Sequence, residues 1–226
     1  MNQSTSSTLA LIGYFAFFGA VHSLLADPRL KGQLRRSLGE AFDRWSRLAF
    51  TILALVMISP FIYILIFLPK KTLYAVPAPF SWLMAAGQAL AALAVLGALR
   101  QTGAAYFLGL AQLRGKVESR GLVTDGFYCH LRNPLFFFGA IFLWLSPIMT
   151  LNLLAFNILA SFYFYIGARH EERSLREEFG EQYENYRQKV PMFLPRLRCS
   201  GFRLQLLVCT FYPVSILLFI LIFISA

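Results

Sequence analysis

Charged residues are scarce in this sequence, and their scarcity sets its class. Only 14% of the 226 residues are Asp, Glu, Lys or Arg, whereas 58% are hydrophobic and the mean hydropathy is +0.59. Soluble domains carry about 25% charged residues. The composition therefore excludes an ordinary soluble domain. Because long apolar runs recur along the chain, we expect an all-α integral membrane protein.

Cysteine and histidine are also rare, with three of each. Cys129, Cys199 and Cys209 are odd in number and show no CxxC spacing, so they indicate neither a disulfide framework nor a zinc site. The histidines are scattered along the chain and form no metal-binding pattern. No metal is predicted.

Six apolar runs predict about six transmembrane helices. The fourth and fifth form a helical hairpin at 134–168, and their arms of roughly 16 to 18 residues are short for a hydrocarbon core of about 30 Å. A re-entrant hairpin is therefore an open alternative, and Pro60 is expected to kink the second span. The predicted spans are 9–26, 48–68, 80–99, 134–149, 151–168 and 204–225.

Acidic residues are fewer than basic ones, 11 against 21, and the basic residues are unevenly distributed. Six Lys and Arg follow the first span, in a charged loop predicted at 27–47. Five follow the third span and eight follow the fifth, whereas only Lys70 and Lys71 lie in the link after the second span. This distribution predicts both termini outside and the basic segments in the cytoplasm. Topology and anionic lipid headgroups account for the net charge of +10, so no nucleic acid partner is predicted.

Two polar stretches flank the hairpin, and we expect chemistry where they meet at the cytoplasmic membrane face. We divide the chain into a three-helix scaffold at 1–99, a cofactor-binding region at 100–198 and a C-terminal transmembrane helix at 199–226. An amphipathic cytoplasmic helix is predicted at about 169–190. The two polar stretches are 121–139 and 171–195.

Arg132 stands two residues before Pro134, which is suited to the first turn of a helix. A guanidinium near a helix N-terminus favours anions, so Arg132 is a candidate clamp for a carboxylate or phosphate. The alternative is an ordinary basic anchor at the membrane surface.

Glu172 falls within the apolar stripe of the predicted cytoplasmic helix, and Glu171 lies at the edge of that stripe. A carboxylate on a buried face is costly unless it is paired. Glu172 therefore either binds a cationic or hydroxyl-bearing ligand group or forms a structural ion pair with Arg132 or Arg169. The stripe consists of Leu175, Phe179, Tyr183 and Tyr186.

Other residues carry weaker signals. Gly121, Asp125 and Gly126 are typical of a loop that lets backbone approach a ligand. Tyr128 is either a hydrogen-bonding ligand contact or an aromatic anchor at the membrane interface. His22, near the end of the first span, is interpreted as satisfying a backbone carbonyl, with catalysis as the alternative.

Two motifs occur in order across the hairpin. The first comprises Gly121, Leu122, Val123, Thr124, Gly126, Tyr128, Arg132, Asn133, Pro134 and Gly139. The second comprises Glu171, Glu172, Leu175, Phe179, Gly180, Tyr183, Tyr186, Val190, Pro191 and Pro195. This series resembles the isoprenylcysteine carboxyl methyltransferase superfamily, which includes membrane thiol methyltransferases and phospholipid N-methyltransferases. The resemblance covers about residues 100–198.

The resemblance implies S-adenosylmethionine, bound between the loop before the fourth span and the helix after the fifth. It implies an integral membrane methyltransferase with Glu172 and Arg132 as catalytic residues. The enzyme would act at the cytoplasmic membrane face on a thiol, carboxylate or lipid headgroup of a lipophilic or amphiphilic acceptor. Departures occur at Asn133, where the motif often has His, and at Phe136, which lacks a Tyr hydroxyl. The implied cofactor-binding residues are Gly121, Leu122, Val123, Gly126, Tyr128, Arg132, Asn133, Pro134, Glu171, Glu172 and Tyr183.

Two functions from other classes remain open. Membrane sterol reductases share a related C-terminal motif and use NADPH, whose extra phosphate would be bound by Arg169, Arg173 and Arg176. The other is a non-catalytic membrane subunit with the same fold. The acceptor is also open between a prenylated cysteine, a small thiol, a quinone-like lipid and an amine headgroup.

Overall fold

A computed structural model describes residues 2–103, 110 and 121–195, and these residues are mostly helical. Four of the described helices are long and apolar enough to cross a membrane. The expectation of an all-α integral membrane protein is confirmed, whereas a count of six spans is not, since the predicted sixth span at 204–225 lies outside the described residues. The four helices are α1 (Gln3–Ala26), α3 (Glu40–Phe67), α4 (Phe80–Thr102) and α8 (Leu151–Phe179).

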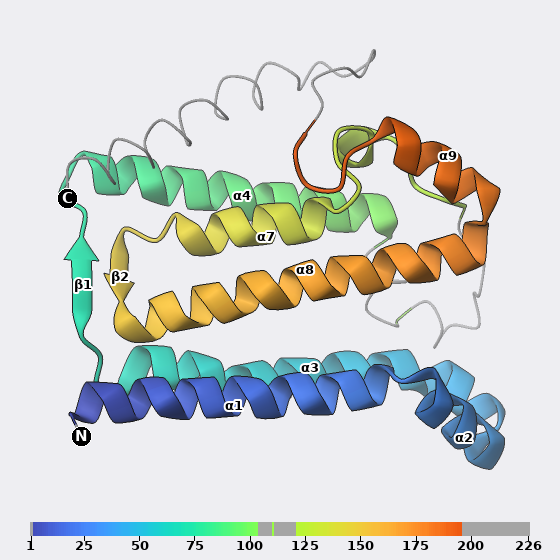
Figure 1. Cartoon of the computed structure of the whole chain (residues 1–226), viewed down its shortest axis with the longest axis horizontal. Helices are drawn as coiled ribbons and strands as arrows, with labels where there is room; N and C mark the ends of the chain where they lie inside the picture. The colour runs from blue at the N-terminus through green and yellow to red at the C-terminus, as the bar shows by residue number, and fades with distance from the viewer. Residues whose placement is uncertain (1, 104–109, 111–120, 196–226) are drawn as a thin grey trace.

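The long helices pack in two groups on either side of α8, as Figure 1 shows. Helices α1 and α3 lie together against one side of α8. On the other side, α4 packs along α7 (Pro134–Trp144), which in turn contacts α8. Most of α4 belongs to the predicted scaffold at 1–99 and α7 belongs to the predicted region at 100–198, so their packing joins the two regions. The domain boundary after residue 99 stays a prediction.

Aromatic side chains fill the contact between α1, α3 and α8. Phe18 and Phe61 are buried with Met57, and Phe156 and Tyr163 from α8 pack against them. Large rings bury extensive apolar surface and prefer tilted or edge-on contacts, which these pairs adopt. Many apolar side chains on the outer faces of α1, α3 and α4 stay exposed, as expected of surfaces that face lipid.

The segment 27–47, which we expected to be a charged loop, contains a further helix, α2 (Pro28–Leu38). The Asp27 carboxylate accepts a hydrogen bond from the Arg29 backbone N–H at 2.6 Å, and Pro28 occupies the first turn. Gly39, with φ of +57°, separates α2 from α3. The three leucines of α2, Leu30, Leu34 and Leu38, recur every fourth residue. This spacing is typical of a helix.

Helix α7 is too short to cross a bilayer by itself. Its 11 residues span about 16 Å, against a hydrocarbon core of about 30 Å. The Gln88 amide donates to the Phe142 carbonyl at 2.9 Å, and the Asn157 amide donates to the Leu143 carbonyl at 3.0 Å. These side chains satisfy carbonyls that lipid would leave unpaired. The predicted arm at 134–149 therefore ends early.

Two short strands, which the sequence did not predict, connect the link after α3 with the turn between α7 and α8. Strand β1 (Thr72–Ala75) pairs antiparallel with β2 (Ile148–Thr150), with Thr72 opposite Thr150. Strand β1 lies in the link after α3, and β2 lies in the turn of the hairpin. The pairing fixes the hairpin turn against the neighbouring link (Figure 1).

The predicted break between the fifth span and the cytoplasmic helix is wrong. Helix α8 is continuous for 29 residues, about 43 Å, which exceeds the bilayer core and carries its last turns beyond it. The chain breaks at Gly180, where φ is +53°, a conformation that favours glycine. Helix α9 (Glu181–Lys189) then forms the second half of the predicted amphipathic segment.

The two ends of the molecule differ. Strands β1 and β2 and the start of α1 lie at one end, whereas α2, α9 and the short helix η1 (Gly126–Cys129) lie toward the other (Figure 1). The described parts of the segments that we predict to be cytoplasmic thus gather at one end, and the link with Lys70 and Lys71 belongs to the opposite end. The membrane side of each end stays a prediction.

A buried polar cluster fastens α1 to α8 at the strand end. Asn152 is fully buried. Its side-chain oxygen accepts a hydrogen bond from the Thr8 hydroxyl at 2.6 Å, and its amide donates to the Ser7 hydroxyl at 3.3 Å. The Ser7 hydroxyl also donates to the Pro69 carbonyl. In lipid, such groups must be satisfied within the protein.

We expect Asn152→Ala to lower the free energy of unfolding by about 1–3 kcal/mol, because two hydroxyls lose a buried partner. Denaturant titration of the purified protein in detergent measures the change. Ser37→Ala on the exposed face of α2 is the matched control, with an expected change of less than about 0.5 kcal/mol. Equal stability of the two variants would show that the cluster contributes nothing.

Candidate functional site

Arg132 is the centre of the site. Its Nε donates to the Glu172 carboxylate at 2.7 Å, and its Nη1 donates to the backbone carbonyls of Arg187 and Val190 at 2.9 and 2.8 Å. The arginine side chain is only 10% exposed. A buried cation is tolerated when it is paired and hydrogen-bonded, so these three acceptors explain how Arg132 is held.

Glu172 faces Arg132, so the structure shows the ion pair with Arg132 that the sequence left as one of two alternatives. Its side chain is 11% exposed, and the same carboxylate oxygen accepts a hydrogen bond from the Asn133 amide at 3.1 Å. The neighbouring Glu171 lies about 100° further round the helix and is exposed. The two adjacent carboxylates thus have different surroundings.

Backbone contacts fix the first motif between α4 and α9. The Arg132 N–H donates to the Pro191 carbonyl at 2.9 Å, and the Tyr186 hydroxyl donates to the Tyr128 carbonyl at 2.6 Å. On the other side, the Phe127 N–H donates to the Gln101 side chain at 3.1 Å. The motif is therefore held from both sides by side chains and backbone.

Gly126 is required by this arrangement. Its φ is +60°, and a Cβ at this position would lie 1.9 Å from the Gln101 side-chain nitrogen. The positive φ therefore favours glycine, and a side chain here would also displace the Gln101 amide that accepts from the Phe127 N–H. The positive φ fits a turn glycine, whereas the predicted approach of the Gly126 backbone to a ligand stays a prediction.

Three tyrosines surround the ion pair and are kept neutral by burial. Burial, reinforced by the Glu172 carboxylate, raises the pKa of Tyr183 to about 12, against the opposing effect of Arg132. Burial also raises the pKa of Tyr128 and of Tyr186. These phenols therefore keep their protons well above neutral pH and can donate hydrogen bonds. The Tyr183 hydroxyl is fully buried and has no hydrogen-bond partner among the described residues.

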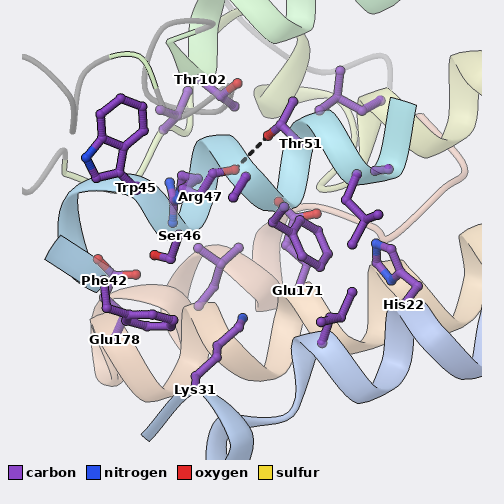
Figure 2. Close-up of a pocket in the computed structure, with 18 of the residues that line it drawn as sticks. His22, Lys31, Phe42, Trp45, Ser46, Arg47, Thr51, Thr102, Glu171 and Glu178 are labelled. Atoms are coloured by element: carbon purple, nitrogen blue, oxygen red, sulfur yellow. Dashed lines mark hydrogen bonds between the residues drawn. The ribbon is translucent and has the colours of Figure 1, made fainter. Parts of the chain in front are cut away.

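A cavity of about 1250 Å³ lies between the motifs and the ends of α1, α2 and α3 (Figure 2). One wall belongs to the motifs and carries Arg132 and Glu171. The other wall is mainly apolar and includes Phe42, Trp45 and Phe50, with Lys31 and Arg47 among them. The cavity combines charged groups of both signs with a large apolar surface.

The predicted cofactor residues divide into two sets. Gly121, Leu122, Val123, Tyr128, Arg132 and Glu171 line the cavity. Gly126, Asn133, Pro134, Glu172 and Tyr183 are not among its described lining residues; of these, Asn133, Pro134, Glu172 and Tyr183 are buried. The contacts of both sets with a ligand stay predictions.

The wall from α2 and α3 was missed because 27–47 was interpreted as a charged loop. Two signals in the segment are typical of a helix. They are the N-terminal cap at Asp27–Pro28 and the leucines at every fourth residue, Leu30, Leu34 and Leu38. Leu34 and Leu38 line the cavity, as does His22 from the end of α1. Glu178 is a further charged lining residue that the sequence analysis did not select.

Arg132 retains one unused pair of donors. Its Nε and Nη1 are engaged, but Nη2 makes no hydrogen bond to the described residues, and the side chain lines the cavity. The same arginine thus stabilises the fold with one side of its guanidinium and offers the other to a ligand.

Comparison with curated proteins reveals relatives for part of the chain. A methanethiol S-methyltransferase of Crocosphaera subtropica is 39% identical over 72 residues, which are 32% of this chain and 28% of the relative. Over about a third of its length, the chain is related to methanethiol S-methyltransferases. The resemblance to the isoprenylcysteine carboxyl methyltransferase superfamily is confirmed for that third.

Other relatives carry the same name. The enzyme of Pseudomonas deceptionensis is 39% identical over 75 residues, 33% of this chain and 29% of the relative. That of Mycobacterium tuberculosis is 37% identical over 75 residues, 31% of each chain. The matches therefore span under a third of these relatives. No family model matches the chain, and no solved structure matches it significantly.

We expect Glu172→Ala to lower the free energy of unfolding by about 3–5 kcal/mol, because it leaves Arg132 buried without a counterion. Denaturant titration of the purified protein measures the loss. Glu184→Ala is the matched control, since its pairs with Arg176 and Arg187 are exposed and should contribute about 0–1 kcal/mol. Similar losses in both variants would contradict a structural role for the buried pair.

We expect Tyr183→Phe to leave stability at neutral pH unchanged or slightly higher, because it removes a buried hydroxyl without a partner. The folded-state pKa of Tyr183, about 12, lies above the ordinary value of 10.0. Below pH 10.0 the Tyr183 phenol is protonated in both the folded and the unfolded protein. Between pH 10.0 and about 12 it ionises only in the unfolded chain, so the free energy of unfolding falls as the pH rises through this window. Unfolding free energy measured across this window should fall less steeply in the variant, and an unchanged slope would refute the assignment.

Proposed function

We propose that this protein is an integral membrane methyltransferase that uses S-adenosylmethionine to methylate a thiol on a lipophilic or amphiphilic acceptor. The observation that carries the proposal is a single cavity with two unlike walls. Arg132 and Glu171 lie on one wall, and apolar side chains of α2 and α3 form the other. A polar cofactor and an apolar acceptor each find complementary surface there.

The donor groups of the cavity suit the polar atoms of S-adenosylmethionine. The free Nη2 of Arg132 would bind its carboxylate, as guanidinium groups commonly do. The Glu171 carboxylate would accept hydrogen bonds from its ammonium group or ribose hydroxyls. Backbone at Gly121 and Val123 lines the same wall and allows close approach to the ligand.

Glu172 and Arg132 would take unequal parts in the reaction. Arg132 would contact the cofactor directly, whereas Glu172 would act as a positioning residue that holds the guanidinium through its 2.7 Å contact. S-adenosylmethionine supplies an electrophilic methyl group on a sulfonium when it is bound. The protein would contribute orientation and exclusion of water, which accelerate methyl transfer without a metal.

The names of the relatives support a thiol as the methyl-accepting group, since all three quoted above are methanethiol S-methyltransferases. The apolar wall supports a larger, lipophilic thiol. At about 1250 Å³, the cavity exceeds the 300–1,000 Å³ typical of small-molecule sites. We propose that the site faces the cytoplasm and that both termini lie outside, as the distribution of Lys and Arg predicts.

The structure gives less support to an NADPH reductase. The arginines suggested for the dinucleotide phosphate, Arg169, Arg173 and Arg176, are absent from the described lining of the cavity. Arg176 instead contacts Glu184 at 3.4 Å. A non-catalytic subunit would keep the fold and the buried ion pair without binding the cofactor.

Thermal unfolding of the detergent-purified protein, titrated with S-adenosylmethionine, its demethylated product and NADPH, tests the proposal. A ligand at 100 times its dissociation constant stabilises the folded state by about 2.7 kcal/mol. We expect the first two ligands to stabilise the protein and NADPH to have no effect. Glu171→Gln should weaken both responses about 5- to 30-fold in affinity, because a charge-assisted hydrogen bond contributes about 1–2 kcal/mol more than a neutral one.

Glu177→Gln, an exposed carboxylate on α8 outside the described cavity lining, is the matched control and should bind as the wild type does. A response to NADPH alone would replace the proposal with a reductase. No response to any of the three ligands, in protein that unfolds cooperatively, would support the non-catalytic subunit.

A further inference from the structure

His22 reaches the cavity from α1 and is one of its lining residues (Figure 2). Its Nδ1 forms a hydrogen bond of 2.6 Å with the Tyr163 hydroxyl of α8. Its ring stacks on Phe18 and meets the edge of Phe50. The imidazole is thus held from three helices, and its orientation is fixed by contacts unrelated to any ligand.

The other ring nitrogen is available. Nε2 of His22 makes no hydrogen bond to the described residues, although the ring is a lining element of the cavity. When Nδ1–H donates to the Tyr163 oxygen, Nε2 carries the lone pair and is a proton acceptor. After protonation, the same Tyr163 oxygen still accepts the hydrogen bond from Nδ1. This arrangement matches a base that is oriented by a second group.

His22 contacts α8 at Tyr163, at a different level of the helix from Glu171. Tyr163 and Glu171 lie eight residues apart on α8, which is about 12 Å along the helix. His22 therefore contacts α8 about two turns before Glu171, and it shares the cavity with the apolar side chains of α2 and α3. The charged and titratable groups around it are Lys31 of α2, His170 and Tyr163 of α8, and Arg47 of α3, which lines the same cavity.

We propose that His22 is the catalytic base that accepts the proton of the acceptor thiol at Nε2. The inference rests on the proposed function, because it requires a thiol as the methyl acceptor. The S–H bond breaks, its electron pair stays on sulfur, and the proton moves to Nε2, which becomes part of an imidazolium. The imidazolium later returns the proton to water in the cavity.

The need for a base follows from thiol chemistry. The thiolate is the nucleophile, and an alkyl thiol is mostly protonated at neutral pH. A positioned base typically contributes 10²–10⁴-fold to such a step. An aryl thiol is largely ionised at neutral pH, so its methylation should not require His22. A pair of acceptors, 1-octanethiol and thiophenol, thus separates proton removal from all other steps.

We expect His22→Gln to lower methylation of 1-octanethiol at pH 7 about 100-fold or more, with little change for thiophenol. The octanethiol rate of the variant should rise about tenfold per pH unit, following the free thiolate, whereas the wild-type rate should level off near neutral pH. Tyr163→Phe removes the orienting hydrogen bond and should lower only the octanethiol rate, by a smaller factor. Glu177→Gln, an exposed position of α8 outside the described cavity lining, is the control and should keep wild-type rates.

A second measurement does not depend on turnover. With the demethylated cofactor product bound, addition of 1-octanethiol at pH 7 should produce the near-ultraviolet absorbance of a thiolate in the wild type and not in His22→Gln. Thermal stabilisation by that product should be equal in the two proteins, which shows that the variant is folded and retains the cofactor site.

The outcomes separate the two hypotheses. If the wild type neither binds the cofactor product nor methylates either thiol, the proposed function fails and the role of His22 fails with it. If the wild type methylates both thiols and His22→Gln loses both equally, or neither, the proposed function stands and the assignment of His22 as a base is overturned.

Discussion

The buried pairing of Arg132 with Glu172 is the contact on which the site depends. One guanidinium neutralises a carboxylate of α8 and also bonds two backbone carbonyls near the end of α9, so it joins three segments through one side chain. The terminal carbonyls of a helix need partners from outside the helix, and here Arg132 supplies them. Arg132 therefore ties together the segments that form this wall of the cavity.

The adjacent glutamates on α8, Glu171 and Glu172, have different roles in the site. Glu172 faces inward and holds Arg132, while Glu171 lies on the cavity side of the helix. Because successive helical residues point about 100° apart, two neighbouring carboxylates can serve the fold and the ligand separately. On the opposite wall, α1 contributes His22 and α3 contributes aromatic rings. The site is thus assembled from both halves of the chain, around a helix that both halves contact.

Hydropathy was sufficient to locate the four long helices, although it ended the last of them too early. The apolar stripe of the predicted cytoplasmic helix indicated that Glu172 is buried and offered Arg132 as one possible partner. The errors arose where distant contacts decide local structure. Helix α8 was broken at its first charged residue, although charge marks only the edge of the bilayer and Gly180 ends the helix. The strands β1 and β2 are too short for a periodic pattern and exist because they pair with each other. The α2–α3 wall depends on how helices pack, which a single-sequence pattern does not specify.

The early end of α7 places opposing requirements on the two amides that pair its last carbonyls. Gln88 and Asn157 lie within apolar helices and lower their hydropathy, yet they pair the carbonyls of Phe142 and Leu143. Replacing either with leucine would improve the helix as a membrane-inserting segment while removing a hydrogen bond that the assembled bundle needs. Membrane insertion therefore favours an apolar residue at these two positions, whereas assembly of the bundle favours an amide. The amides present at both positions meet the requirement of assembly.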